Sequence, residues 1–525
     1  MRNEKLELDR HIEWRMGETR TPGMAVALLD REKTLRVAAY GMANRETQAP
    51  VTPDTLFEIG SVSKTFAAVA ALQSAEAGLL DLHAPVAEYL PWFRVQTRHA
   101  PITIHHLLSH TSGLAGGVDA DFSPDARGMV WSLRETEAAF APGTHFYYAE
   151  ANYQTLTLVL EAVHGQPYAE IVQAGILDPL GMTNTVAAIT HDVRPRLARG
   201  YRPLYDDRPA HASHPLVPAP WLEMGSGDGC IASTAGDMAR FGRMLLNRGG
   251  PILSKASYHL MTRPVIAEAE YGYGLYAFES DGFAHVGHGG DMPGYEAYLW
   301  LDVDNGLGMT MLVAQPYPSQ LSWQVLELLR AAYLDQPLPT FPPTDVTRVE
   351  QAAEFAGTYH AGEKALTLVT EGDRLLLEHA GERLVLERRG QNRFYVPHPD
   401  FDRYLLQFGR QDGQVVEVTH GPDWYTNDRY AGPREFPYPA EWDAYPGHYR
   451  AHNPWASNFR VIVRQGELLL VWPSGDEEPL TPLADGSLRV GDEFSPERLR
   501  FDQLADGWAL RATLTCCSYY RFFTP

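Results

Sequence analysis

The chain has 525 residues, which is more than one ordinary hydrophobic core holds, so we expect about two to four domains. Its formal net charge is −22, and an acidic surface repels phosphate backbones, which argues against nucleic acid as a partner. The sequence contains no apolar run of about 20 residues, so we expect no membrane span.

The cysteines and the N-terminal residues indicate in which cellular compartment the protein is expected. Cys230, Cys516 and Cys517 form no disulfide framework, because neighbouring cysteines rarely bond to each other. No Cys/His cluster has the spacing of zinc ligands, so we expect no metal. No apolar run follows the first basic residues, so we expect no signal peptide and a cytoplasmic location.

Residues 1–335 predict mixed α/β structure from the spacing of their apolar residues. The predicted elements are, in chain order, a helix near the N-terminus, a strand at 24–29, helices at 61–77, 156–163 and 236–246, and strands at 298–301 and 309–313. Thr234 is expected near the start of the third of these internal helices. Asp304-Asn305-Gly306 is a turn signal between the last two strands.

The composition changes after this region. Residues 336–343 are rich in proline, which continues neither a helix nor the interior of a sheet, so we interpret 336–345 as a linker. Beyond it, short alternating stretches such as 366–369 and 374–378 are separated by turn signals. This pattern is typical of antiparallel barrels or sandwiches.

A short motif occurs twice in this second half. The sequence Phe-Ala-Gly-Thr-Tyr at 355–359 is echoed by Tyr-Pro-Gly-His-Tyr at 445–449. Each copy is followed by a strand, a glycine turn and a leucine-rich strand, with Gly372 in the first copy and Gly466 in the second. The matching order predicts two β-barrel domains, at 346–433 and 434–525.

Ser61 and Lys64 form the pattern Ser-x-x-Lys at the start of a predicted helix. Residues i and i+3 share one face of a helix, so the lysine lies beside the serine hydroxyl. A serine is a weak nucleophile unless a base takes its proton, and a buried lysine can act as that base. The helix N-terminus also favours developing negative charge. A helix cap with a surface lysine gives the same pattern, so neighbouring segments must decide.

Four further segments resemble the serine β-lactamase and penicillin-binding-protein-like family, in particular its class C and DD-carboxypeptidase branch. They lie, in the family's order, at 102–114, 142–148, 177–182 and 231–241. The resemblance makes Ser61 the nucleophile and implies an antiparallel sheet with helices on its faces and an all-α region. The fold class that we expect is therefore α+β, with this catalytic domain followed by two antiparallel β-barrel domains.

The resemblance assigns roles at a second motif, which is Tyr-x-Asn in the family and Tyr148-Ala149-Glu150 here. Tyr148 would share proton transfer with Lys64 and protonate the leaving group. Tyr147 is the alternative, although the spacing of the motif favours Tyr148. An ionised carboxylate only accepts hydrogen bonds, so Glu150 either pairs with Lys64 and keeps it protonated or binds a substrate ammonium. The sequence does not choose between these.

The family's third motif is Lys-Thr-Gly, or His-x-Gly in some peptidases, and His288-Gly289-Gly290 supplies it here. The resemblance places His288 across the pocket from Ser61, with glycines that let a substrate approach the strand. The implied oxyanion hole is formed by the backbone N–H groups of Ser61 and Asp291. Penicillin-hydrolysing members usually carry lysine at this position, so the histidine resembles D-aminopeptidases, some DD-carboxypeptidases and related esterases.

The domain plan narrows the resemblance further. A catalytic domain followed by two eight-stranded barrels resembles D-stereospecific aminopeptidases, in which a loop of the last barrel reaches the catalytic cleft. The acidic residues Asp476 and Glu477, in the segment 472–479, are candidates for binding a substrate ammonium there. The segment 452–458 is a second candidate loop.

We therefore expect a serine hydrolase that forms an acyl-enzyme on small amides or peptides, with a D-aminopeptidase or D-amino-acid amidase as the leading class. The expected partner is this small-molecule or peptide substrate, no cofactor is required, and a homodimer is left open. One alternative is a carboxylesterase or weak β-lactamase on the same scaffold. Another is a catalytically impaired protein that binds peptides or cell-wall fragments, because Glu150 traps Lys64 as an ion pair.

Overall fold

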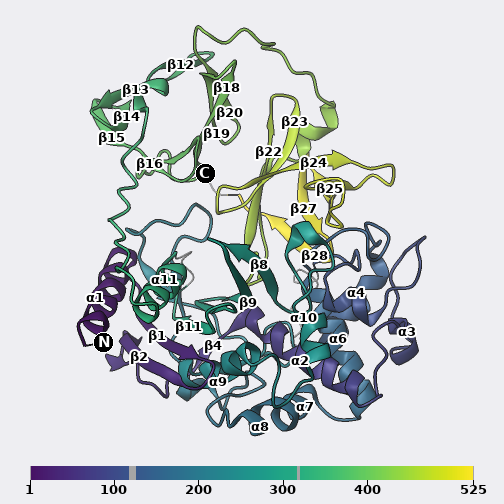
Figure 1. The fold of residues 1–525 in the computed structure, drawn as a ribbon. Helices are drawn as coiled ribbons and strands as arrows, with labels where there is room; N and C mark the ends of the chain where they lie inside the picture. The colour runs from purple at the N-terminus through teal and green to yellow at the C-terminus, as the bar shows by residue number, and fades with distance from the viewer. Residues whose placement is uncertain (1, 117–125, 316–319, 524–525) are drawn as a thin grey trace. The chain divides into compact units, whose positions relative to one another are not determined.

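The computed structural model describes residues 2–116, 126–315 and 320–523 (Figure 1). Contacts divide the chain into a first unit of residues 1–202 and 216–341 and a second unit of residues 203–215 and 342–525. The domain boundaries expected near 335, 345 and 433 stay a prediction. Across the described ranges, no helix combines the length and apolar character needed to cross a bilayer.

The first unit is built on a seven-stranded antiparallel sheet. Its strands run, from edge to edge, in the order β3 (Ala49–Pro50), β2 (Thr34–Asn44), β1 (Gly23–Asp30), β11 (Leu307–Val313), β10 (Tyr295–Asp302), β9 (Phe283–Met292) and β8 (Tyr276–Ser280). The three strands predicted in this half of the chain are confirmed, as β1, β10 and β11.

Both faces of this sheet are buried. Along β1, residues 25, 27 and 29 belong to one hydrophobic core, and residues 24, 26 and 28 belong to another, as the alternation of side chains in a strand requires. The first core includes α9 (Ala235–Leu246), and the second includes α1 (Arg2–Thr19) and α11 (Leu321–Tyr333).

The predicted all-α region is also present. It contains α2 (Ser63–Glu76), α4 (Ile104–Leu108), α5 (Ala126–Ser132), α6 (Glu150–His164) and α7 (Tyr168–Val172), and α6 contacts the other four. The helix predicted at 61–77 begins as a short 3₁₀ helix, η1 (Gly60–Val62), and continues as α2. Thr234 caps α9 by accepting a hydrogen bond from the Asp237 backbone N–H at 3.2 Å.

Short elements complete the first unit. They are β4 (Phe57–Glu58), α3 (Val86–Tyr89), α8 (Asp178–Leu180), β5 (Tyr201–Pro203), β6 (Leu216–Pro218), β7 (Ala232–Ser233) and α10 (Lys255–Met261). β4 pairs with β7 directly before the turn that carries Ser61, and β5 pairs with β6. The pairing of β4 with β7 fixes the chain that leads into this turn.

The second unit contains two antiparallel sheets. The first has nine strands: β12 (Gly357–Ala361), β13 (Lys364–Glu371), β14 (Arg374–His379), β15 (Glu382–Val385), β16 (Glu387–Arg388), β17 (Arg393–Tyr395), β18 (Leu406–Gln411), β19 (Gln414–His420) and β20 (Asp423–Thr426). The second is a closed barrel of eight: β21 (Gly447–Arg450), β22 (Asn458–Arg464), β23 (Glu467–Val471), β24 (Glu477–Pro482), β25 (Leu488–Val490), β26 (Arg498–Ala505), β27 (Trp508–Leu514) and β28 (Cys517–Arg521).

The α+β fold class is confirmed, with one correction to the strand number. The first C-terminal sheet has nine strands in place of eight, and its two edges are β15 and β16. Only Leu386 separates these two strands in the chain, and its backbone N–H donates to Leu375 at 2.9 Å. One interrupted stretch therefore forms both edges, which leaves this barrel nearly closed.

The sequence repeat has a structural counterpart in two buried tyrosines. Tyr359 in β12 donates its hydroxyl hydrogen bond to the Phe355 carbonyl at 2.9 Å. Tyr449 in β21 donates in the same way to the Tyr445 carbonyl at 2.7 Å. Both side chains lie in the cores of their sheets, so each copy of the motif fixes the entry of the chain into the first strand of a barrel.

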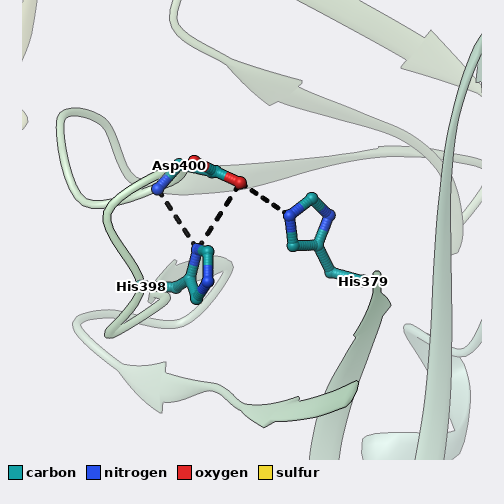
Figure 2. Close-up of side chains that lie close together, drawn as sticks. All are labelled: His379, His398 and Asp400. Atoms are coloured by element: carbon teal, nitrogen blue, oxygen red, sulfur yellow. Dashed lines mark hydrogen bonds and ion pairs between the residues drawn. The ribbon is translucent and has the colours of Figure 1, made fainter. Parts of the chain in front are cut away.

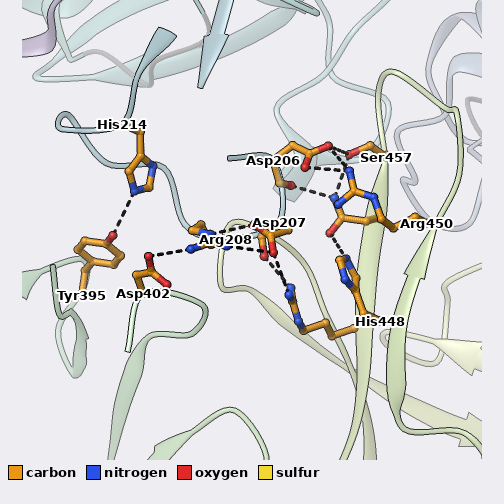
Figure 3. A network of polar contacts seen from close by, with 11 residues as sticks. Asp206, Asp207, Arg208, His214, Tyr395, Asp402, His448, Arg450 and Ser457 are labelled. Carbon is orange, nitrogen blue, oxygen red and sulfur yellow. Dashed lines mark hydrogen bonds and ion pairs between the residues drawn. The ribbon is translucent and has the colours of Figure 1, made fainter. Parts of the chain in front are cut away.

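Residues 203–215, which we name the inserted segment, lie between β5 and β6 in the chain but belong to the second unit. Asp206 accepts from Arg450 of β21 at 2.7 Å, and Arg208 donates to Asp402 of the nine-stranded sheet's β17–β18 loop at 2.8 Å (Figure 3). The inserted segment therefore binds charged residues of both C-terminal sheets.

Candidate active site

Ser61 lies in the turn between β4 and α2, and it is half-buried. The preceding residue, Gly60, has a φ of +50°, and a Cβ there would lie 2.6 Å from the Asp291 carbonyl oxygen. Only glycine meets both the backbone conformation and this close approach. The turn therefore presents Ser61 directly against β9.

Lys64 is fully buried on the first turn of α2, and three groups surround its ammonium. Its Nζ donates to Ser61 Oγ at 3.0 Å, to Glu150 Oε2 at 2.5 Å and to the Asp228 carbonyl oxygen at 2.9 Å. The helical spacing thus brings the serine and lysine together as the sequence predicts. Glu150 pairs with Lys64, which is the first of the two roles considered for it.

A second buried carboxyl, that of Asp228, lies close to this pair. Burial raises the pKa of both Glu150 and Asp228, and the positive charge of Lys64 opposes this effect. Gln154 of α6 donates to Asp228 Oδ2 at 3.1 Å, while Oδ1 has no partner among the described residues. Asp228 was not predicted from the sequence, although its glycine-rich setting, Gly-Ser-Gly-Asp-Gly at 225–229, is a signal for a close approach of backbone.

Tyr148 is the tyrosine of its motif that lies beside Lys64. The Lys64 Nζ is 4.9 Å from the centroid of its ring. Burial raises the pKa of Tyr148 well above its usual value, the Glu150 carboxylate adds to this, and a hydrogen bond with Ser61 opposes it. Tyr148 is therefore a neutral hydroxyl, which suits a proton donor better than a resting base.

His110, to which the sequence motifs assign no role, holds this part of the site in place. Its ring stacks on Tyr148 with centroids 4.3 Å apart. Its Nδ1 accepts from the Ala149 backbone N–H at 3.1 Å and from Asn152 Nδ2 at 3.0 Å. Burial lowers the pKa of His110, so the ring is neutral and fixes the start of α6, where Glu150 lies.

His288 lies on β9 and is buried. Burial lowers its pKa to about 3, and the charge of Lys64 contributes in the same direction. Nδ1 lies 2.5 Å from the Gly289 carbonyl oxygen, which requires the ring proton on this nitrogen. Nε2 then accepts from the Tyr271 hydroxyl at 3.1 Å. The His288 ring therefore carries no charge at neutral pH.

The backbone of β9 approaches the Ser61 turn at the two residues after Gly289. A Cβ on Gly290 would lie 1.9 Å from the Ile59 carbonyl oxygen, and a Cβ on Gly60 would lie 2.8 Å from the Asp291 nitrogen. A Cβ on Gly289 would meet only Tyr298, at 3.8 Å. These distances show that the backbone at Asp291 lies close to the Ser61 turn, and an oxyanion hole formed by the N–H groups of Ser61 and Asp291 stays a prediction.

The first unit of the chain matches a known protein family over most of its length. The Beta-lactamase family profile matches residues 8–331. The chain belongs to the beta-lactamase family. The resemblance read from the sequence motifs is thus confirmed.

Individual relatives of this beta-lactamase-family chain differ in their named activities. Penicillin-binding protein 4 of Amycolatopsis lactamdurans is 30% identical over 372 residues, which cover 65% of this chain and 94% of that protein. Esterase EstB of Burkholderia gladioli is 36% identical over 197 residues, which cover 33% of this chain and 49% of that protein. The family and these relatives indicate a serine hydrolase of the beta-lactamase type.

A solved structure supports the fold over most of the beta-lactamase-family chain. The octameric penicillin-binding protein homologue from Pyrococcus abyssi has a TM-score of 0.60 and 24% identity. The match covers 80% of this chain and 99% of that chain. This likeness bears on the fold, which extends beyond the catalytic region into the C-terminal sheets.

The acidic residues predicted to bind substrate from the last barrel are already paired with arginines. Asp476 accepts from Arg393 at 2.8 Å, and Glu477 accepts from Arg464 at 2.5 Å. In the second candidate loop, Ser457 donates to Asp206 of the inserted segment at 2.9 Å. All of these contacts lie within the second unit. A role of the barrel loops in substrate binding stays a prediction.

A cluster of histidine and aspartate side chains lies in the nine-stranded sheet of the second unit (Figure 2). The ligand-type atoms of His379, His398 and Asp400 all lie within 4.8 Å of one another. Asp400 accepts from His379 Nε2 at 2.7 Å, and its backbone N–H donates to His398 Nδ1 at 3.2 Å. These bonds tie the end of β14 to the loop that carries Asp402, the partner of the inserted segment.

Proposed function

We propose that the chain is a serine hydrolase that forms an acyl-enzyme on Ser61 and acts on small amides or peptides. The observation that carries this proposal is the 3.0 Å contact between Lys64 Nζ and Ser61 Oγ at the start of α2. A base within hydrogen-bond reach of a serine hydroxyl is the feature that makes the serine a nucleophile.

The acylation step uses the groups around Ser61. Lys64, in its neutral amine form, takes the hydroxyl proton as Ser61 Oγ bonds to the substrate carbonyl carbon. The backbone N–H groups of Ser61 and Asp291 stabilise the oxyanion. Lys64 then returns the proton by way of the Tyr148 hydroxyl to the leaving nitrogen as the carbon–nitrogen bond breaks. Water, deprotonated by the same groups, releases the acyl group and regenerates Ser61.

Because His288 is uncharged, the site favours a substrate that has no carboxylate group beside this residue. Since its pKa is about 3, the ring offers no positive charge to an anionic group at neutral pH. Amides and peptides with a free amino group fit this environment better than β-lactams do. We propose a D-aminopeptidase or D-amino-acid amidase as the leading class, with Gly289 and Gly290 letting the substrate lie along β9.

A panel of substrates tests the proposal. The wild-type chain is assayed with D- and L-aminoacyl amides, p-nitrophenyl esters and nitrocefin, beside Ser61→Ala. The expected result is turnover of aminoacyl amides, preferably of the D-series, that disappears in Ser61→Ala. Turnover that survives this substitution would exclude the mechanism.

The carboxylesterase and weak β-lactamase alternatives use the same residues. The neutral His288 favours the esterase of these two, because an ester needs no cationic anchor, and the esterase relative reported above agrees with it. Turnover of esters with no detectable turnover of amides would select the esterase. Efficient turnover of nitrocefin would select the β-lactamase.

The alternative of a catalytically impaired binding protein rests on a different observation, the 2.5 Å ion pair between Lys64 and Glu150. A lysine that a carboxylate holds in its ammonium form has no lone pair with which to accept the serine proton. Such a protein would bind peptides without forming an acyl-enzyme. Intact-mass measurement after a fluorophosphonate separates the two cases, because only a working nucleophile gains the adduct.

A further inference from the structure

A cavity of about 440 Å³ lies in the first unit, and none of the residues proposed for catalysis lines it. Its walls come from residues 43–58, 191–200 and 219–221, together with Tyr295 of β10. Sites for small molecules are commonly concave and of about 300–1,000 Å³. The cavity is therefore large enough for a ligand of a few heavy atoms up to a dipeptide.

Glu58 of β4 contributes a carboxyl to this cavity. The residue is 4% exposed, and the described residues give its side chain no hydrogen bond and no ion pair. Burial raises the pKa of Glu58 to about 8. A buried carboxyl without a partner is unfavourable, so a donor that occupies the cavity would be bound at this point.

Three arginines line the same cavity: Arg194, Arg196 and Arg199. In the described part of the chain, none of them has a carboxylate partner within ion-pair distance. The guanidinium of Arg194 lies 5.2 Å from the centroid of the Trp221 ring, which is itself part of the wall. Planar guanidinium groups of this kind match a carboxylate in two-point hydrogen bonding.

Glu58, the three arginines and Tyr295 all line this cavity. Burial is the main cause of the raised pKa of Tyr295, the Glu58 carboxylate raises it further, and Arg199 and Arg194 oppose this. The Tyr295 hydroxyl itself donates to the Ala198 carbonyl at 2.7 Å, so it does not satisfy Glu58.

We propose that this cavity binds a zwitterionic amino acid or short peptide, with the ligand's ammonium on Glu58 and its carboxylate on the arginines. An anion alone leaves the buried Glu58 without a donor, and a cation alone makes no contact with the arginines, of which Arg199 is half-buried and Arg194 and Arg196 are exposed. A zwitterion satisfies both ends, and Trp221 offers an apolar surface for its side chain. The site does not use Ser61, so it stands apart from the proposed hydrolase.

Isothermal titration calorimetry on the full chain tests this proposal, in a Ser61→Ala background so that no turnover adds heat. The probes are D- and L-leucine, leucine amide, which lacks the carboxylate, and N-acetylleucine, which lacks the ammonium. We expect one leucine per chain for at least one enantiomer. Both blocked forms should bind at least tenfold more weakly.

Variants assign this binding to the cavity. Glu58→Gln and Arg199→Gln should each weaken leucine binding at least tenfold, while Glu268→Gln, an exposed residue outside the cavity, should leave it unchanged. Because Glu58 titrates near pH 8, binding an ammonium at pH 7 should also release a proton, seen as a heat that differs between buffers of different ionisation enthalpy.

Three outcomes would overturn the proposal. They are the absence of leucine binding, equal binding of N-acetylleucine and leucine, and unchanged binding in both Glu58→Gln and Arg199→Gln. If Glu58→Gln fails to fold, as judged by thermal melting, the Arg199→Gln variant and the blocked ligands still decide the result.

Discussion

Lys64 Nζ lies 2.5 Å from Glu150 Oε2, in a site where the lysine side chain is fully buried. A buried ammonium is unfavourable unless it is paired, and Glu150 supplies such a partner for Lys64. The charged form is not the one that accepts a proton from Ser61. Burial also raises the pKa of Glu150, which makes the carboxyl a better proton acceptor. We therefore expect Glu150 to control how much of Lys64 is available as a base.

Replacing this carboxylate is the direct test of that control. Glu150→Asn should raise kcat/KM at pH 7 about tenfold, because a buried lysine that loses its counter-ion favours the neutral amine. The rising limb of the pH–rate profile should move to lower pH, and Glu150→Gln should act in the same direction. Profiles of p-nitrophenyl ester turnover measure both effects. A fall in kcat/KM with an unmoved profile would mean that Glu150 only positions Lys64.

An added methyl group should affect activity differently at the two glycines that follow His288. Gly290→Ala places a Cβ 1.9 Å from the Ile59 carbonyl oxygen, so β9 must move away from Ser61. We expect kcat to fall about 10²- to 10³-fold, as for loss of an oxyanion-hole donor. Gly289→Ala meets only Tyr298 at 3.8 Å, so β9 stays in place, and we expect kcat within about tenfold of wild type with the larger effect on KM, because Gly289 is proposed to let the substrate lie along the strand. Equal losses in both variants would argue against the assigned oxyanion hole.

The pH dependence should show no step from His288 near neutral pH. Its pKa of about 3 means that it gains a proton only in strong acid, so the ring stays neutral between pH 5 and 9. The profile of kcat/KM for a neutral ester is the measurement, in wild type and in His288→Gln. An inflection near pH 6.5 that disappears in the variant would show that His288 titrates in the working range.

The inserted segment should stabilise the second unit until the pH becomes strongly acidic. Although burial opposes it, hydrogen bonds from Arg208 and Arg460 hold the pKa of Asp207 at about 2, below the value of about 3.9 for an unfolded aspartate. The stabilisation is therefore complete above pH 4 and is lost as the pH falls from about 4 to 2.

Asp207→Asn removes this charge and should destabilise the second unit by about 1.5–3 kcal/mol at pH 7. Hydrogen exchange of peptides from both C-terminal sheets is the readout, with Asp192→Asn, an exposed aspartate of the first unit, as the control. Unchanged protection in Asp207→Asn would show that the inserted segment does not contribute to the stability of the sheets.

The parts of the site that are local in sequence were predictable. Ser61 and Lys64 are three residues apart on one helix, so helical geometry alone brings them together. The tyrosine repeat and the apolar run at 24–29 are likewise local patterns, and each predicted an element that is present.

The rest of the site depends on contacts between distant segments. Asp228 reaches Lys64 from 164 residues away, and His110 supports Ala149 across 39 residues. Neither residue has a neighbour in sequence that reveals its partner. Similarly, the sequence around Glu58 predicts only a short buried strand, and the folded chain places this residue in a cavity that Arg194, Arg196 and Arg199 also line.

The central claim is that Ser61 is a nucleophile activated by Lys64, and covalent labelling tests it most directly. Intact-mass and peptide mapping after treatment with a fluorophosphonate should give one adduct per chain, located on Ser61. The adduct should be absent in Ser61→Ala and should form about 10²- to 10⁴-fold more slowly in Lys64→Met, as expected for loss of a general base. No adduct in wild type, or an adduct on another residue that persists in Ser61→Ala, would contradict the account.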